Sequence, residues 1–232
     1  MCGRFTITIE AAALQLELGF SETPVEWKPR FNVAPTQPVA VINDPVKKQI
    51  EYMRWGLVPS WSKDLEIGNR LINARSETID QKPSFKNSFA RRRCLILADG
   101  FYEWQRDKNK KTPSQPYYFY LRDRKLFAFA GIWDHWQSPE GSELFSCSII
   151  TCPANEIVRP YHDRMPVILT SNDFWPWLEK LENRELKQFL KPIDANLMAV
   201  HPVSRLVNSA LVESPECIEP INKSGSSNQL FP

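Results

Sequence analysis

The stretch RCLILADGFYEW, residues 93–104, decides the fold. Its continuous apolar run predicts a strand that is buried in the core. Asp-Gly is a turn pair, so we expect this strand to break at Asp99-Gly100. Glu103 follows just past the break, between Tyr102 and Trp104. The stretch therefore predicts the centre of a β core and a carboxylate held among aromatic rings.

Short segments rich in apolar and aromatic residues on both sides of this stretch predict further strands. They are residues 50–59, 116–122, 126–134, 145–154, 162–169 and 197–204. Residues 9–19, 84–93 and 172–190 have helical patterns, and residues 71–78 predict a helix or a turn. The mixture predicts an α+β fold: one domain over residues 1–222, with a curved antiparallel, barrel-like β core and peripheral helices. Residues 223–232 predict a flexible tail.

Composition excludes several classes of protein. The net charge of +2 means that any binding of nucleic acid must come from a local patch. The five cysteines are odd in number and include no closely spaced pair, so we expect neither a disulfide framework nor a metal site. We expect no cofactor, no signal peptide and no membrane span. A monomer in the cytoplasm, associated with the nucleoid, fits these features.

The chain begins MCGRF, which raises the question of chemistry at Cys2. Removal of Met1 would give Cys2 a thiol and a free α-amine on adjacent carbons. An α-amine has a pKa near 8, so part of it is neutral at pH 7 and attacks an aldehyde to form an imine. The neighbouring thiol then closes a thiazolidine ring, a step that no internal lysine can perform. The alternative to this chemical role is that Cys2 is simply a small apolar residue near a frayed chain end.

Four further positions are candidates for acid–base or polar chemistry. Desolvation among aromatic rings raises the pKa of a carboxylate such as Glu103, although a hairpin-edge ion pair would also explain it. His162, between Tyr161 and Asp163, is an acid–base candidate or a histidine bonded within a turn. Asn73 and Arg75 point the same way if their segment is extended, and could orient a sugar hydroxyl and a phosphate.

Nine motifs in order resemble the SRAP family of abasic-site processing proteins. They are MCGRF (1–5), NVAP (32–35), WGLVPSW (55–61), NARSE (73–77), RRCLILADGFYEW (92–104), FAGIW (129–133), SIITCPAN (148–155), HDRMPV (162–167) and HPVS (201–204). Each motif alone is weak, but nine in sequence are specific, and they run through nearly the whole chain. The resemblance implies a single SRAP domain with a barrel-like β core.

The resemblance also implies a function. It implies a sensor of abasic sites in single-stranded DNA that forms a covalent DNA–protein crosslink, with crosslink-forming (lyase-like) and autoproteolytic peptidase activity. The family's catalytic positions fall on Cys2, Asn73, Glu103 and His162. Autocatalytic cleavage in the family exposes the cysteine, although a separate aminopeptidase could equally remove Met1.

Other motif positions imply contacts with the DNA. Arg4, Arg75 and Arg164 occupy positions that contact DNA phosphates in the family. Pro35 and Trp61 fall where the family packs against or wedges the DNA beside the lesion. A bacterial member carries a tandem tryptophan at the wedge, whereas this chain has Trp61-Ser62, which implies a smaller stacking surface.

Two other functions stay open at this point. N-terminal-nucleophile amidohydrolases also begin with a cysteine after removal of methionine, but they use an oxyanion arrangement that is usually an Asn-Gly segment, and this chain has no such dipeptide. A non-covalent module for single-stranded DNA would use tryptophans as stacking platforms. Release of ammonia from glutamine would favour the first, and equal binding of intact and abasic DNA the second.

Overall fold

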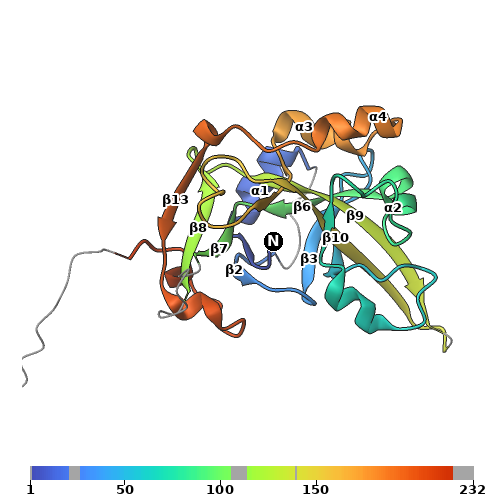
Figure 1. Ribbon diagram of the computed structural model, residues 1–232, viewed down its shortest axis with the longest axis horizontal. Coiled ribbons are helices and arrows are strands. Elements are labelled where there is room, and N and C mark those ends of the chain that lie inside the picture. Colours follow the sequence, from blue (N-terminus) through green and yellow to red (C-terminus); the bar gives the residue numbers. More distant parts are fainter. Residues whose placement is uncertain (1, 21–26, 106–113, 139, 222–232) are drawn as a thin grey trace, which may run out of the picture.

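The apolar run that opens the sequence argument forms strand β6 (Arg93–Ala98), in which every residue is buried. The chain then continues as β7 (Gly100–Gln105) in a different sheet, so the predicted break at Asp99 is the point where the chain changes sheets. The Asp99 carboxylate fixes this point by accepting hydrogen bonds from the Thr6 and Thr8 hydroxyls, at 2.6 and 2.7 Å. This computed structural model describes residues 2–20, 27–105, 114–138 and 140–221 (Figure 1).

Five strands close into a barrel. They are β3 (Pro38–Ile42), β4 (Glu51–Trp55), β6, β9 (Phe127–Gln137) and β10 (Glu143–Pro153). Antiparallel pairs join β4 to β3, β3 to β6, β6 to β9 and β9 to β10. The ring closes through a parallel pair between β10 and β4. The predicted barrel-like core is confirmed, although its closing pair is not antiparallel.

Short strands extend the barrel at its edges. β5 (Asn73–Arg75) pairs parallel to the second half of β10, β11 (Arg164–Pro166) pairs antiparallel to the end of β10, and β12 (Ile168–Leu169) pairs with β9. The prediction of a helix at residues 71–78 is therefore wrong, although turns do follow β5. Residues 73–75 are extended because their backbone forms hydrogen bonds with β10, which is distant in sequence. The local sequence pattern does not indicate these bonds.

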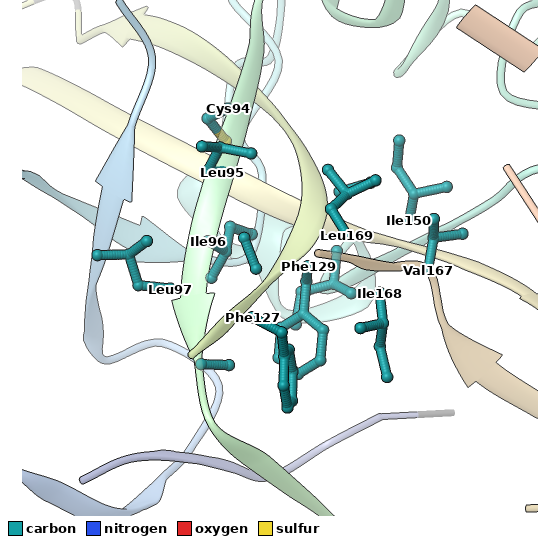
Figure 2. Packing of buried hydrophobic residues seen from close by; sticks show 14 of the residues in the cluster. Cys94, Leu95, Ile96, Leu97, Phe127, Phe129, Ile150, Val167, Ile168 and Leu169 are labelled. Carbon is teal, nitrogen blue, oxygen red and sulfur yellow. The ribbon is translucent and has the colours of Figure 1, made fainter. Parts of the chain in front are cut away.

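The second sheet is antiparallel throughout, in the order β13-β8-β7-β1-β2. Its strands are β13 (Met198–Pro202), β8 (Gln115–Leu121), β7, β1 (Phe5–Ile7) and β2 (Arg30–Val33). Phe5 of β1 joins the two sheets because its ring lies 5.1 Å from Trp55 and 5.4 Å from Phe129 of the barrel. Figure 2 shows Phe127 and Phe129 of β9 packed beside Ile168 in the same core.

Helices lie on the periphery (Figure 1). α1 (Ala11–Leu18) lies within the predicted helical pattern of residues 9–19 and ends at Gly19, whose φ of 68° is left-handed. The other α-helices are α2 (Lys86–Arg91), α3 (Ser171–Leu178) and α4 (Asn183–Leu186). The 3₁₀ helices are η1 (Leu65–Arg70), η2 (Lys187–Phe189), η3 (Ala195–Leu197), η4 (Arg205–Asn208) and η5 (Pro215–Cys217).

The predicted helix over residues 172–190 is interrupted between α3 and α4. Glu179 adopts an extended conformation there, and the Arg93 guanidinium donates to the carbonyl oxygens of Trp177 and Glu179, which end α3. The predicted tail at 223–232 lies outside the described residues. In the part of the chain that the structure describes, no helix is long and apolar enough to cross a membrane.

Candidate functional site

The β1–β7 pairing determines where the start of the chain lies. Phe5 is opposite Phe101, and the Tyr102 backbone N–H donates to the Arg4 carbonyl oxygen at 3.0 Å. Cys2 lies two residues before Arg4, and its Sγ donates to the Arg4 carbonyl oxygen at 3.7 Å. Glu103, which follows Tyr102, is near enough for its charge to act on the Cys2 thiol. The two sheets therefore enclose the first residues of the chain.

Cys2 is completely buried in the chain that still carries Met1. Burial raises the pKa of the Cys2 thiol well above its usual range, and the nearby Glu103 carboxylate raises it further. A thiol in this environment is protonated at neutral pH. It needs a base before it can act as a nucleophile, and Glu103 is the ionisable side chain beside it.

Asn73 holds the backbone of Cys2. It lies on β5, and its Nδ2 donates to the Cys2 carbonyl oxygen at 2.8 Å. Its Oδ1 is buried and accepts no hydrogen bond from the described residues. Ala74 between Asn73 and Arg75 is buried, so the predicted alternation holds and places Arg75 at the surface. The Asn73 Nδ2 is therefore bonded to Cys2, whereas its Oδ1 can still accept a hydrogen bond beside Cys2.

Glu103 and the segment that carries His162 meet through a pair of tyrosines. Glu103 lies on β7 with only 4% of its surface exposed, and Tyr117 of β8 lies directly opposite it. The Tyr117 ring is 4.4 Å from the Tyr161 ring, and Tyr161 precedes His162 in the chain. The contact between the two tyrosines therefore brings the segment that contains His162 close to β7 and β8, although these segments are distant in sequence.

His162 is partly exposed and makes two close contacts through the same nitrogen. Its Nδ1 accepts a hydrogen bond from the Arg164 backbone N–H at 3.0 Å, and it also lies 2.8 Å from an oxygen of Asp163. The first contact requires a lone pair on Nδ1, whereas a bond to Asp163 requires a proton there. The backbone contact is the more firmly fixed, because the Asp163 side chain is 87% exposed.

The three arginines lie in different environments. The Arg4 guanidinium is half-buried, with one terminal nitrogen 2.7 Å from both Asn32 Oδ1 and the Val207 carbonyl oxygen, and burial lowers the pKa of Arg4. Arg164 is bound to Glu77 by two hydrogen bonds of 2.9 Å. Arg75 is exposed. Only Arg75 among the three presents its charge directly to solvent.

Trp61 protrudes from a loop that is tied down on both sides. Its side chain is 57% exposed. The Ser60 backbone N–H donates to Asp134 at 3.1 Å, and the indole N–H of Trp136 donates to the Ser62 carbonyl oxygen at 2.7 Å. Pro35 is half-buried and precedes Thr36, whose φ of 73° is left-handed. Trp61 is therefore an exposed aromatic side chain on an anchored loop.

Several residues that hold the site escaped the sequence argument. They are Asn32, Glu77, Tyr117, Thr151, Asp134 and Trp136. Each acts through a contact with a residue distant in sequence. Asn32, Glu77 and Thr151 lie within the NVAP, NARSE and SIITCPAN motifs, but a motif does not indicate these contacts. In the described ranges, no cluster of His, Cys, Asp and Glu side chains could hold a metal ion.

Comparison with known proteins places this geometry in a family. The family described as "SOS response associated peptidase (SRAP)" matches residues 1–210. The abasic site processing protein YoqW of Bacillus subtilis is 43% identical over 225 residues, which cover 94% of this chain and 99% of YoqW. The abasic site processing protein HMCES of Gallus gallus is 34% identical, and the match covers 95% of this chain and 78% of HMCES.

Solved structures show the same fold. A protein from Bacteroides thetaiotaomicron superposes with a TM-score of 0.82 at 26% identity, covering 94% of this chain and all of that one. A protein from Bordetella bronchiseptica superposes with a TM-score of 0.75 at 25% identity over 88% of this chain. On the family match, the identity to curated relatives and the shared fold, the chain belongs to the SRAP family.

Proposed function

We propose that this protein processes abasic sites in single-stranded DNA by forming a covalent thiazolidine crosslink through Cys2, which shields the lesion. Membership of the SRAP family and the names of its relatives support this function. The observation that carries it is the 2.8 Å hydrogen bond from Asn73 to the Cys2 carbonyl oxygen. This bond fixes the backbone of a residue whose amine and thiol must reach the same carbon.

The proposed reaction balances without a cofactor. An abasic sugar is in equilibrium with a ring-opened aldehyde. The neutral α-amine of Cys2 adds to the aldehyde carbon, and loss of one water gives an imine. The Cys2 sulfur then adds to the imine carbon, and the thiol proton ends on the ring nitrogen. The product contains the whole protein and the whole DNA strand, less one water.

Each polar residue of the site has a role in this sequence. Glu103, buried beside Cys2, assists ring opening of the sugar and takes the thiol proton. Asn73 holds the Cys2 backbone and offers its unused Oδ1 to the α-amine or a sugar hydroxyl. His162 protonates the departing oxygen and assists reversal of the crosslink. The sulfur closes the thiazolidine ring by adding to the imine carbon, so the amine reacts first.

Removal of Met1 is the step that makes Cys2 reactive. The Cys2 side chain is fully buried in the chain that carries Met1, and its nitrogen is then part of a peptide bond. Loss of Met1 frees the amine, and we infer that it also opens access to the sulfur. Autoproteolysis at the Met1–Cys2 bond and a separate aminopeptidase are both compatible with this step.

DNA capture before the reaction depends on charge and stacking. Arg75 is exposed and suited to a phosphate contact, whereas Arg4 and Arg164 already have protein partners. Exposed Trp61, with Pro35, offers an apolar surface against bases beside the lesion. Stacking on an aromatic ring requires an unpaired base, which favours single strands.

A denaturing gel tests the proposal. Wild-type protein incubated with abasic single-stranded DNA should give an adduct that survives heating, whereas DNA without the lesion should give none. Cys2→Ala should form only an imine, which is lost on heating unless borohydride reduces it. Glu103→Gln should form the stable adduct more slowly. A heat-stable adduct in Cys2→Ala without reductant would refute the thiazolidine assignment, and ammonia released from glutamine would favour an amidohydrolase.

A further inference from the structure

His162 lies on a loop that leaves the barrel and returns to it. β10 ends at Pro153, β11 begins at Arg164, and these two residues are paired. A backbone hydrogen bond of 3.0 Å from the Ala154 N–H to the Asp163 carbonyl oxygen closes the base of the loop. These bonds fix where the loop begins and ends. The direction in which the loop leans, and with it the position of His162, depends on what its other residues contact.

The Tyr161 side chain, next to His162, packs against the second sheet. Its ring centroid lies 4.4 Å from that of Tyr117 and 5.2 Å from that of Phe119, and both of these residues are on β8. Tyr161 and Tyr117 are partly buried and pack against the main core. The contact therefore joins a loop of the barrel to a strand of the other sheet, at the residue that precedes His162.

The face of the second sheet that Tyr161 covers is the face that carries Glu103. Tyr117 is directly opposite Glu103 in the β7–β8 pair, and residues directly opposite one another project from the same face. Phe119 is opposite Phe101 in the same pair, and their rings stack at 5.0 Å. Phe101 and Glu103 are two residues apart on β7, so their side chains share a face. Tyr161 thus packs onto the sheet beside the Glu103 carboxylate.

We propose that Tyr161 is a positioning residue that holds His162 in place relative to Glu103. The inference rests on the proposed function and deepens it. His162 comes from the barrel and Glu103 from the second sheet, so proton transfers at one sugar require a fixed spacing between the two sheets. The packing of the Tyr161 ring on β8 fixes that spacing at the loop. The ring makes this contact, so the phenolic hydroxyl is not required for it.

Crosslinking rates at saturating abasic single-stranded DNA test the ring contact. Tyr161→Leu keeps an apolar side chain but removes the aromatic ring, and adduct formation should slow roughly 10- to 100-fold, as for a misplaced catalytic group. Tyr161→Phe keeps the ring and should react at the wild-type rate. The DNA concentration that gives half the maximal rate should be the same in both variants and the wild type. A Tyr161→Phe variant as slow as Tyr161→Leu would assign the role to the hydroxyl and overturn the inference.

A double-mutant cycle with His162→Gln shows whether Tyr161 acts through His162. His162→Gln should itself slow adduct formation. Residues that act as a unit have non-additive effects, so adding Tyr161→Leu to His162→Gln should slow the reaction by no more than about twofold further. If the double variant instead loses the full effect of both substitutions, Tyr161 acts independently of His162 and the inference is wrong.

Phe189→Leu is the matched control for loss of an aromatic contact. The Phe189 ring is partly buried and packs edge-on against Trp177 at 5.8 Å, among the peripheral helices. The variant should lose a similar part of the free energy of unfolding and still form the adduct at the wild-type rate. An equally slow Phe189→Leu variant would show that lost stability alone explains the effect of Tyr161→Leu, which overturns the inference.

Failure of the inference and failure of the proposed function give different results. If wild-type protein forms the heat-stable adduct and Tyr161→Leu forms it equally fast, the inference alone fails. If wild-type protein forms no adduct with abasic DNA, the proposed function fails and the inference fails with it.

Discussion

In the proposed reaction, Cys2 uses its amine and its sulfur in turn, and the chemistry of the two groups sets their order. In the chain that carries Met1, the Cys2 sulfur is buried and lies near the Glu103 carboxylate. Burial and the charge of Glu103 each raise the pKa of the thiol. An α-amine has an ordinary pKa near 8 and is partly neutral near pH 7. In the proposed reaction the amine therefore reacts first, and the sulfur adds to the resulting imine once its proton passes to a base.

Asn73→Asp tests whether the reaction requires the hydrogen bond between Asn73 and the Cys2 backbone. The substitution keeps the size of the side chain, removes the N–H that donates to the Cys2 carbonyl oxygen and adds a second carboxylate beside Cys2. We expect adduct formation to slow by roughly 10-fold or more and the free energy of unfolding to fall by about 1 kcal/mol. Single-turnover crosslinking and urea unfolding measure the two effects.

Asn69→Asp is the control for that substitution. Asn69 lies in the 3₁₀ helix η1, where its Oδ1 accepts an exposed hydrogen bond from Arg54, and an aspartate retains that acceptor. Its crosslinking rate should equal the wild-type rate. If Asn73→Asp also reacts at the wild-type rate, the Asn73 hydrogen bond has no part in the reaction.

At this scale, the sequence predicts the chemical groups but not what holds them. The thiol, amide, carboxylate and imidazole of Cys2, Asn73, Glu103 and His162 followed from motifs. Their partners did not, because a motif carries no distances. The 203-residue separation between Arg4 and Val207, which share a hydrogen bond, illustrates why local patterns cannot report such contacts.

Among the elements, the loop that carries Trp61 shows how an exposed aromatic residue is made rigid. Buried side chains of β9 bond its backbone on either side of Trp61, through Asp134 to Ser60 and through Trp136 to Ser62. Asp134 is itself paired with Arg92 at 3.0 Å. A loop whose backbone is held in this way loses less conformational freedom on binding, which increases the net stabilisation from stacking.

Trp136→Phe tests this anchoring. The phenyl ring fills most of the buried space but cannot donate to the Ser62 carbonyl oxygen. We expect the affinity for intact single-stranded DNA to fall, but by less than in Trp61→Ala, which removes a stacking contact worth about 1–3 kcal/mol. Fluorescence anisotropy of labelled DNA measures both variants.

Trp27→Phe is the matched control, because its indole N–H donates to the Ile9 carbonyl oxygen away from this loop. It should lose a comparable amount of stability with no loss of DNA affinity. Equal affinities in wild type, Trp136→Phe and Trp61→Ala would show that this loop does not contact the strand.

Elements with strong local signals were predicted well, and those defined by distant pairing were not. The apolar run of β6 and the glycine stop of α1 are local features. β5 was not recognised as a strand because its three residues depend on parallel bonds to β10. The long helix expected at 172–190 is divided because Arg93, from another element, caps its first part.

On the scale of the whole molecule, the C-terminal part of the described chain closes over the second sheet. Glu213 accepts backbone hydrogen bonds from Phe31 and Asn32 of β2, and His201 of β13 bonds the Ile218 carbonyl oxygen at 2.8 Å. Arg4 joins the same region through Val207. Residues 201–218 therefore hold Arg4 and β2 in place. Because Arg4 lies two residues from Cys2, loosening of these contacts would also affect the candidate site.

His201 makes this closure sensitive to acid. Burial lowers the pKa of His201 below its usual value of about 6.5, so the folded protein favours the neutral ring. The unfolded chain then binds more protons than the folded one as the pH falls below about 6.5, and stability falls with it. His201→Gln keeps a donor for the Ile218 carbonyl oxygen and should flatten this dependence. Urea unfolding at pH 7.5 and 5.5 measures it, and an unchanged difference between the two would contradict the assignment.

The closure of the barrel could not be predicted from the pattern of strands. Alternation and turns indicated a curved antiparallel sheet, and the antiparallel pairs bear this out. The parallel pair of β10 with β4 closes the ring across a separation of 92 residues, from Ser146 to Arg54. The sequence pattern indicates which face of each strand is apolar. Closure of the barrel depends on which edge strands pair in space, and the pattern does not contain that information.

If the freed amine and sulfur of Cys2 together trap a sugar aldehyde, the product has a defined mass. The most direct test is an intact-mass spectrum of the protein, denatured after incubation with and without abasic single-stranded DNA. We expect a chain without Met1 and, with DNA, one new species whose mass equals that chain plus the strand less one water. A stable adduct on a chain that retains Met1, or no adduct on a chain that has lost it, would contradict the claim.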